Sequence, residues 1–157
     1  MDQLDVRILA LFGEHPRIGV LEASRRLGVA RGTVQARLDK LESAGVVRGW
    51  GPDVDPAAVG YPVTAFVTLG IRQLRGHDPL AVRLAAIPEV LEVHTITGSG
   101  DLLCRVVARS NADLQRVIDA IVEVDGVERT ATVIALATLV TYRAQPLLTA
   151  SASGAGP

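Results

Sequence analysis

The spacing of apolar residues changes near residues 50–60 of this 157-residue chain. Before that point apolar residues recur every three or four positions, which is typical of helices with one buried face. After Pro62 they alternate with polar residues, which is typical of strands. We therefore predict two domains joined by a proline-containing linker, followed by a Gly-, Ser- and Ala-rich tail that is expected to be disordered. The predicted division is 1–50, 51–61 for the linker, 62–143, and 144–157 for the tail.

The first domain is predicted to hold three helices and a short strand. A tight turn at residues 28–29 joins the second and third helices, and Gly45 ends the third. The weakly alternating stretch that follows predicts a strand, or wing. This order indicates a winged helix-turn-helix, in which the second helix of the motif enters the major groove of DNA. The predicted helices are at about 2–13, 20–27 and 31–44, and the wing is at 46–51.

Basic residues are concentrated in the first domain. Residues 15–48 hold seven Lys or Arg against three Asp or Glu, whereas the whole chain has a net charge of −1. Such a charge distribution is typical of a module that binds a polyanion, and we predict double-stranded DNA as the partner. The alternative is a small helical bundle with a solvated basic face.

The apolar stripe of the third helix leaves its early polar positions outward, where they would meet base edges. Arg can bind guanine and Gln can bind adenine through two hydrogen bonds, and the surrounding cations suit phosphate contacts. The base-edge candidates are Arg31, Gly32, Gln35 and Ala36, with Thr33 at their flank. The phosphate candidates are Arg25, Arg26, Arg37, Lys40 and Arg48.

The second domain is predicted to have the order β-α-β-β-α-β. Its strands are expected at 63–71, 90–97, 102–108 and 127–142, with a helix at 79–87 and another that Asn111 caps. This order is that of the ferredoxin-like fold. The chain is therefore predicted to be an α+β protein, with an N-terminal winged helix-turn-helix followed by a ferredoxin-like βαββαβ domain.

The last predicted strand is apolar on both faces. Two helices cover only one face of a four-stranded sheet, and an antiparallel sheet with a solvated second face should alternate apolar and polar residues. We therefore predict that the second face packs on another subunit. The alternative is a locally apolar edge strand.

A glycine-rich loop, "TITGSGDLLC", joins two of the predicted strands. It has no lysine, so it is not a Walker phosphate loop, and Leu103 stands where a dinucleotide fingerprint needs a third glycine. A β-hairpin turn accounts for its glycines and its aspartate. Whether the loop also binds a ligand is left open by these residues.

Two parts of the chain resemble the Lrp/AsnC, or feast/famine, regulators in order and spacing. The matching segments are "LDVRIL", "RLGVARGTVQARLDKLESAGVVRGWGPDVDPAAVGY", "TGSGDLL" and "VDGVERTATVIAL", which together span roughly residues 2–143. The resemblance implies a DNA-binding domain, a ferredoxin-like ligand-sensing domain, and transcription controlled by an amino acid or a related metabolite. It also implies homodimers that often assemble into tetramers or octamers. Where the family usually has a capping Ser or Thr, this chain has Ala30.

The resemblance also places the effector site at the glycine loop. The candidate effector residues are Gly98, Ser99, Gly100, Asp101, Thr130 and Thr132. Asp101 would accept from an α-amino group, and backbone N–H groups of the loop would hold a carboxylate. Gly100 stands where the family often has an aromatic residue, so the pocket is either wider here or lost.

Other functional classes have weaker support in the sequence. The single cysteine, Cys104, permits no intramolecular disulfide and no cysteine-based zinc site. No apolar run approaches the roughly 18 residues of a membrane helix, and we expect a cytoplasmic protein without cofactor. His94 and Glu92 are more typical of a polar pair on a sheet than of a metal site. A sirohaem-decarboxylase-like enzyme, for which His94 and Arg105 are the only indication, and a ligand-independent oligomeric DNA-binding protein remain alternatives to a non-enzymatic regulator.

Overall fold

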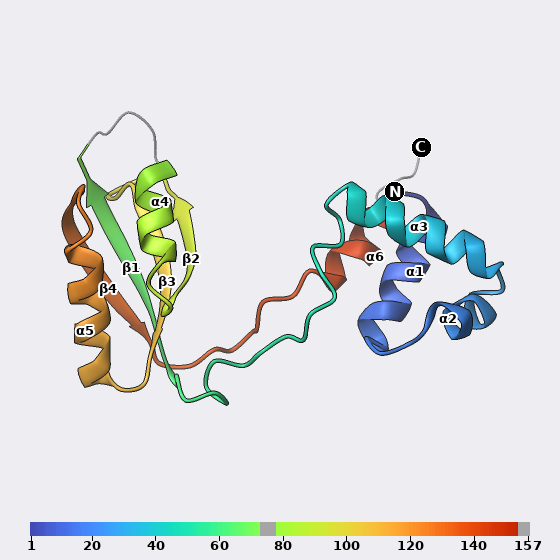
Figure 1. The fold of residues 1–157 in the computed structure, drawn as a ribbon, viewed down its shortest axis with the longest axis horizontal. Coiled ribbons are helices and arrows are strands. Elements are labelled where there is room, and N and C mark those ends of the chain that lie inside the picture. Colours follow the sequence, from blue (N-terminus) through green and yellow to red (C-terminus); the bar gives the residue numbers. More distant parts are fainter. Residues whose placement is uncertain (73–77, 154–157) are drawn as a thin grey trace. The chain divides into compact units, whose positions relative to one another are not determined.

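The computed structural model describes residues 1–72 and 78–153 (Figure 1). The chain divides into two compact units. The first contains residues 1–52 together with the C-terminal segment from Val140, and the second contains residues 53–139. Each unit has its own apolar core.

The first unit is built on three helices, α1 (Gln3–Glu14), α2 (Val20–Leu27) and α3 (Arg31–Ser43). α1 begins with a capping box, because the Asp2 side chain accepts from the Asp5 backbone N–H and the Asp5 side chain accepts from that of Asp2. One apolar stripe from each helix meets in the core, as the helical spacing predicts. The buried core residues are Ile8, Ala23, Leu27, Val34 and Leu38.

The turn between α2 and α3 depends on one glycine. Gly28 has φ of 70°, the left-handed conformation that glycine adopts without a Cβ penalty, and its N–H donates to the Arg25 carbonyl. Ala30 is the N-cap residue that precedes α3, and its side chain makes no capping hydrogen bond. The helix predicted to enter DNA therefore lacks the side-chain cap that Ser or Thr would supply.

Replacing Ala30 by Ser is expected to stabilise the first unit by about 0.5–2 kcal/mol, because the hydroxyl would satisfy a free N–H of the first turn. The backbone of Ala30 is already extended, as a cap requires. Urea unfolding followed by the fluorescence of Trp50, the single tryptophan, measures the change. Ala36→Ser, on the exposed middle of the same helix, is the control. A gain of equal size in both variants would contradict capping as the cause.

The predicted strand of the wing does not form. Residues 46–50 are irregular, and within residues 1–72 and 78–153 no segment pairs with them as a strand. The Trp50 ring instead folds back on Phe12 in a T-shaped contact, with centroids 5.4 Å apart, and its indole N–H donates to Glu42. This segment therefore closes the first unit through an aromatic contact.

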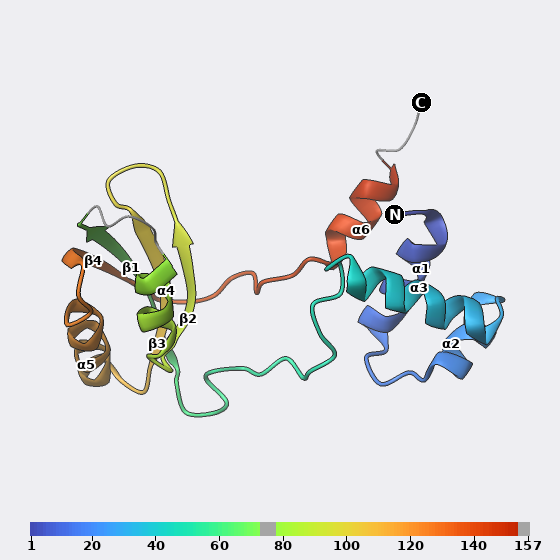
Figure 2. The same cartoon turned by 45° about the horizontal axis from the view of Figure 1, so that its top comes forward.

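Residues 145–153 differ from the expected disordered tail, whose last four residues, 154–157, lie outside the described residues. Gln145–Ser153 form α6, which packs against α1 (Figure 2). Pro146 lies in the first turn of α6, where a missing N–H costs no helical hydrogen bond. A Cβ on Gly13 of α1 would come within 2.1 Å of the Gln145 amide nitrogen, so glycine permits this close approach.

The second unit has the predicted β-α-β-β-α-β order. Its elements are β1 (Val63–Ile71), α4 (Asp78–Ala85), β2 (Val90–Thr95), β3 (Leu102–Ala108), α5 (Asn111–Val122) and β4 (Val127–Ala135). The strands form an antiparallel sheet in the order β2-β3-β1-β4. The ferredoxin-like prediction is confirmed.

Several boundaries differ from the sequence prediction: α4 covers 78–85 instead of 79–87, and β2 ends at Thr95 instead of residue 97. β4 ends at Ala135 instead of continuing to residue 142: Ala135 pairs with Thr64, the second residue of β1, and residues 136–142 pair with no strand among the described residues. α5 is capped by Ser110 and not by Asn111: the Ser110 hydroxyl accepts from the Asp113 N–H, 3.0 Å away.

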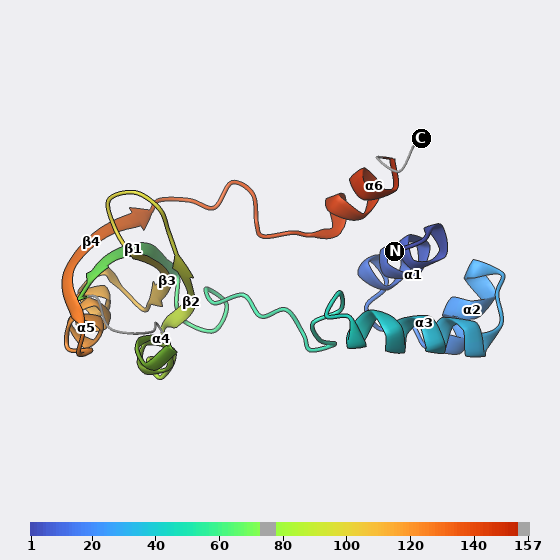
Figure 3. The ribbon, with the colours of Figure 1, turned by 90° about the horizontal axis from the view of Figure 1, so that it is seen from above.

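Both helices of the second unit cover the same face of its sheet (Figure 3). The core beneath them is aliphatic and includes Cys104, whose thiol pKa is raised to about 11 by burial. We call the other side of the sheet the open face. By strand register it includes Phe66 and Thr68 of β1, Leu103 and Arg105 of β3, Glu92 and His94 of β2, and Arg129 and Val133 of β4.

Candidate nucleic-acid interface and ligand loop

α3 presents most of the base-edge candidates to solvent. Val34, Leu38 and Leu41 are buried on the opposite side of the helix. The N-terminal part of α3 is therefore oriented as a recognition helix requires. The exposed candidates are Arg31, Gly32, Gln35 and Ala36, and Thr33 is half-buried beside them.

Gln35 already has a hydrogen-bond partner on its own helix. Its amide nitrogen donates to the Asp39 carboxylate over 2.8 Å, one turn along α3. A glutamine that binds adenine uses both its amide oxygen and its amide nitrogen. Because a glutamine amide nitrogen carries two N–H donors, the bond to Asp39 leaves one donor and the amide oxygen of Gln35 for a base.

The phosphate candidates differ in how far they are engaged within the protein. Arg25 and Arg26 both pair with Glu22, at 3.9 and 3.1 Å, but all three side chains are exposed, and such pairs exchange readily with other anions. Arg48 donates to the Tyr142 hydroxyl at 3.4 Å. Lys40 and Arg31 are exposed and form no ion pair within the described part of the chain.

Arg37 has a different position from the one expected of a phosphate contact. Its guanidinium pairs with Asp2 and, at 3.0 Å, with the buried Asp5 carboxylate at the start of α1. The hydrogen bonds to these two carboxylates raise the Arg37 pKa. The Asp2 pKa is lowered by the Asp5 N–H and by Arg37. Arg37 therefore ties α3 to α1, and we assign it a structural role.

The glycine loop joins the antiparallel strands β2 and β3 and arches beyond their ends (yellow in Figure 2). Gly98 has φ of 115°, which only glycine adopts readily. Asp101 fixes the loop to β1, because its N–H donates to the Leu69 carbonyl and its carboxylate accepts from the Ile71 N–H, both at 2.8 Å. One carboxylate oxygen of Asp101 is thus already in use within the protein.

Gly100 is in close contact with Thr68. A Cβ at this position would come within 2.2 Å of the Thr68 γ-methyl group and 3.2 Å of the Leu69 carbonyl oxygen. β1 therefore occupies the space into which an aromatic side chain at position 100 would extend. The loop lies on the open face. Gly100 lets the loop approach the sheet and does not widen a pocket.

Thr130 and Thr132 lie on the opposite side of the sheet from Gly100. Thr130 pairs with Leu69 and Thr132 with Val67, and both partners are buried in the core beneath the helices. Directly paired residues share a face, so the two threonines belong to the helix-covered face. The structure therefore brings residues 98–101 together but does not bring Thr130 and Thr132 to the same face.

Arg129 is a contact of the loop that the sequence did not reveal. It lies on β4 opposite Gly70, and a Cβ on Gly70 would come within 2.4 Å of the Arg129 Nε. Its guanidinium donates to the Ser99 carbonyl at 3.1 Å. The only sequence signal is a glycine within a strand, which marks a close approach without naming the neighbour.

His94 and Glu92 form a polar cluster with Arg105 on the open face. The Glu92 carboxylate lies 3.8 Å from the His94 imidazole and 3.9 Å from the Arg105 guanidinium. Residues 1–72 and 78–153 contain no group of three or more His, Cys, Asp or Glu arranged to hold a metal ion. His94 and Arg105, the only residues that indicated an enzyme, thus share Glu92 as their carboxylate partner.

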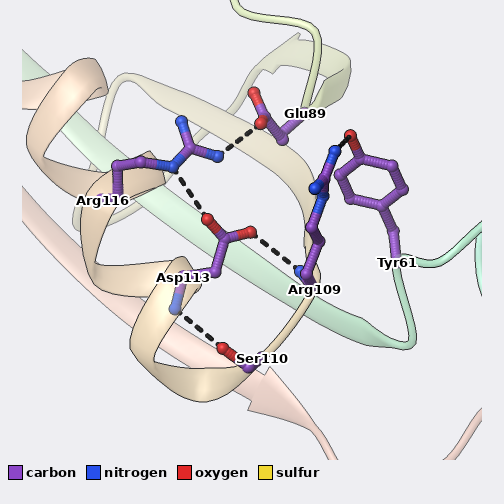
Figure 4. A network of polar contacts seen from close by, with 6 residues as sticks. All are labelled: Tyr61, Glu89, Arg109, Ser110, Asp113 and Arg116. Atoms are coloured by element: carbon purple, nitrogen blue, oxygen red, sulfur yellow. Dashed lines mark hydrogen bonds and ion pairs between the residues drawn. The ribbon is translucent and has the colours of Figure 1, made fainter.

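A second polar network holds the start of α5 (Figure 4). The Asp113 carboxylate accepts from the Arg116 guanidinium and from the Arg109 N–H, and these two bonds, Arg116 first, lower its pKa. Arg116 also donates to the nearly buried Glu89, and Arg109 lies over the Tyr61 ring and donates to its hydroxyl. The network joins the segment before β1 to α5, and its role is structural.

The described part of the chain holds no helix that is long and apolar enough to cross a membrane.

Comparison with known proteins adds to these observations. Residues 1–48 match a family model described as winged helix-turn-helix DNA-binding, and residues 64–145 match the Lrp/AsnC ligand binding domain. The chain is 31% identical to the regulatory protein AsnC of Escherichia coli over 137 residues, 87% of this chain and 90% of that protein. It is 30% identical to the transcriptional regulator FL11 of Pyrococcus horikoshii over 138 residues, 88% and 91% of the two chains.

Solved structures give the same result. The structure of E. coli AsnC has a TM-score of 0.83 and 28% identity, and the match covers 93% of this chain and 99% of that one. A feast or famine regulatory protein from M. tuberculosis, complexed with L-methionine, has a TM-score of 0.81 and 29% identity, over 91% and 97% of the two chains. The chain therefore belongs to the Lrp/AsnC family of transcriptional regulators, with a helix-turn-helix DNA-binding domain followed by the family's ligand-binding domain.

Proposed function

We propose that this regulator binds duplex DNA through the N-terminal half of α3. The observation that carries the proposal is the exposure of Arg31 and Gln35 on the side of α3 that faces away from the core. Arg31 has no carboxylate partner among the described residues, so its donors are available for guanine or phosphate. Arg25, Arg26, Lys40 and Arg48 supply the surrounding phosphate contacts, and Arg37 holds the helix in place.

Base contacts and phosphate contacts are expected to respond differently to substitution. Gln35→Ala should change the preferred sequence, whereas Lys40→Ala should weaken binding to all duplexes alike and reduce the slope of log affinity against log salt by about one. Fluorescence anisotropy with DNA from upstream of the protein's own gene, at several salt concentrations, measures both effects.

Arg72→Ala is the matched control for the loss of one charge, since Arg72 is an exposed arginine of the second unit. We expect it to leave the affinity and the salt slope unchanged. Equal losses in Lys40→Ala and Arg72→Ala would contradict a specific interface on the first unit, and an altered sequence preference in Lys40→Ala alone would reverse our orientation of α3.

The second part of the proposal concerns ligand control. The M. tuberculosis relative is complexed with L-methionine, and this chain carries a ligand-binding domain of the same family. We infer that an amino acid or a related metabolite binds at residues 98–101 and changes DNA binding or assembly. Assembly is proposed to use the open face, with a homodimer as the basic unit and tetramers or octamers built from it.

The apolar residues of the open face support the dimer. Phe66 and Val133 pair across β1 and β4, and their side chains are 38% and 67% exposed. Adjacent exposed apolar side chains on a sheet are typical of a surface that a second subunit covers. The symmetric partner would present the same pair, as in most homodimers.

A further inference from the structure

We propose that Arg129 binds the carboxylate of an α-amino acid at the glycine loop, while the second carboxylate oxygen of Asp101 binds its ammonium group. The inference rests on the proposed ligand control and deepens it, because it names Arg129, a residue outside the loop, as the one that selects for the ligand carboxylate. The inference has three grounds. The Arg129 side chain crosses Gly70 to the loop, Arg129 has no charged partner among the described residues, and it lies at the same end of β1 as Asp101.

The position of Arg129 is set by the absence of a side chain on Gly70. The Arg129 Nε and Cγ lie 2.4 and 2.6 Å from the point where a Gly70 Cβ would be. The arginine stem therefore crosses β1 from the edge strand β4, and the guanidinium reaches the loop, where it donates to the Ser99 carbonyl at 3.1 Å. Any side chain at position 70 would block this path.

No carboxylate among the described residues forms an ion pair with Arg129. Four other arginines of the second unit, Arg72, Arg83, Arg105 and Arg116, each lie within 4 Å of a carboxylate. Arg129 forms no ion pair in the described ranges, and its one hydrogen bond is to a neutral carbonyl. A guanidinium has five N–H donors arranged to fit a carboxylate. A ligand carboxylate would supply the missing partner.

Asp101 provides the complementary charge nearby. Its Oδ2 accepts from the Ile71 N–H and its own N–H donates to the Leu69 carbonyl, so it flanks the same Gly70 that Arg129 crosses. Its Oδ1 has no partner among the described residues. An α-amino acid carries an ammonium and a carboxylate on adjacent carbon atoms, and an acid and a guanidinium at one strand end match that pair.

Isothermal titration with L-methionine and two blocked analogues tests the proposal. L-methioninamide lacks the carboxylate charge, and N-acetyl-L-methionine lacks the ammonium. The wild-type protein is expected to bind L-methionine about 10–100-fold more tightly than either analogue, as the loss of a charge-assisted hydrogen bond predicts. Arg129→Gln should bind L-methionine and the amide alike, Arg129→Lys should restore part of the preference, and Arg105→Gln, on the same open face, should behave as wild type.

Asp101→Asn tests the other half of the site. It keeps an acceptor for the Ile71 N–H but removes the charge, so it should lose the preference for the free ammonium and keep the preference for the carboxylate. If Arg129→Gln weakens L-methionine and L-methioninamide by the same factor, or retains the wild-type preference, Arg129 is not the carboxylate-binding residue.

The two proposals fail in different ways. If the wild-type protein binds none of the twenty common amino acids, ligand control at the loop is wrong, and the role of Arg129 is wrong with it. If the wild type binds an amino acid other than methionine, the amide and N-acetyl derivatives of that amino acid are used. Binding in the wild type with no acid-over-amide preference would leave ligand control in place and overturn only the assignment of Arg129.

Discussion

Val133→Asp is expected to convert the proposed homodimer into monomers. The Val133 side chain is 67% exposed on the open face, so an aspartate there is solvated in the monomer and should cost the isolated fold little. In a symmetric dimer two carboxylates would be buried without partners, and the penalty is several kcal/mol for each charge. The dissociation constant should therefore rise by about 100-fold or more, which sedimentation velocity over a range of concentrations measures.

Val82→Asp is the matched control for this change. Val82 lies on α4, is 70% exposed, and is on the helix-covered side of the sheet. The same substitution there should leave the dissociation constant of the dimer unchanged. If Val133→Asp remains a dimer while its thermal stability equals that of the wild type, subunits do not associate through the open face.

Gly100→Ala is expected to destabilise the second unit by about 1–3 kcal/mol, the usual cost of forcing extra atoms into a packed site. The added methyl group would overlap the Thr68 γ-methyl group, and β1 beneath it is the second strand from the edge of the sheet and is fixed on both sides. Differential scanning calorimetry of the full chain measures the loss.

Thr68→Ala should rescue Gly100→Ala. It removes the γ-methyl at 2.2 Å and leaves the Thr68 Cβ at 3.7 Å, an ordinary contact distance. The double variant should therefore be more stable than the sum of the two single changes predicts, with a coupling free energy of about 0.5–3 kcal/mol. Additive effects would show that the loop does not rest on Thr68. Gly98→Ala, which has open space around its Cβ and strain only from φ, is the control that should show no coupling to Thr68.

The secondary structure of both units could be predicted from the sequence because local signals agree with the tertiary fold. Helical spacing identified the buried stripe of α3, and alternation identified β1 and β3 with the bounds that the structure shows. The signals that failed were those that depend on a distant partner. The predicted wing pairs with no strand in the described part of the chain, β4 ends opposite the first residues of β1, and residues 145–153 form a helix that packs against α1.

The candidate sites divide in the same way. The sequence by itself determined which residue types gather on α3 and in the glycine loop, because charge, helical spacing and glycine content are local properties. Only the tertiary structure decided what those residues contact: Arg37 with Asp2 and Asp5, Gly100 with Thr68, and Arg129 across Gly70 to Ser99. Each of these contacts joins residues about thirty or more positions apart in the chain. The contacts of Gly100 and Arg129 also depend on which face of the sheet a residue lies on. Strand register fixes that face, and a shift of one residue would reverse it.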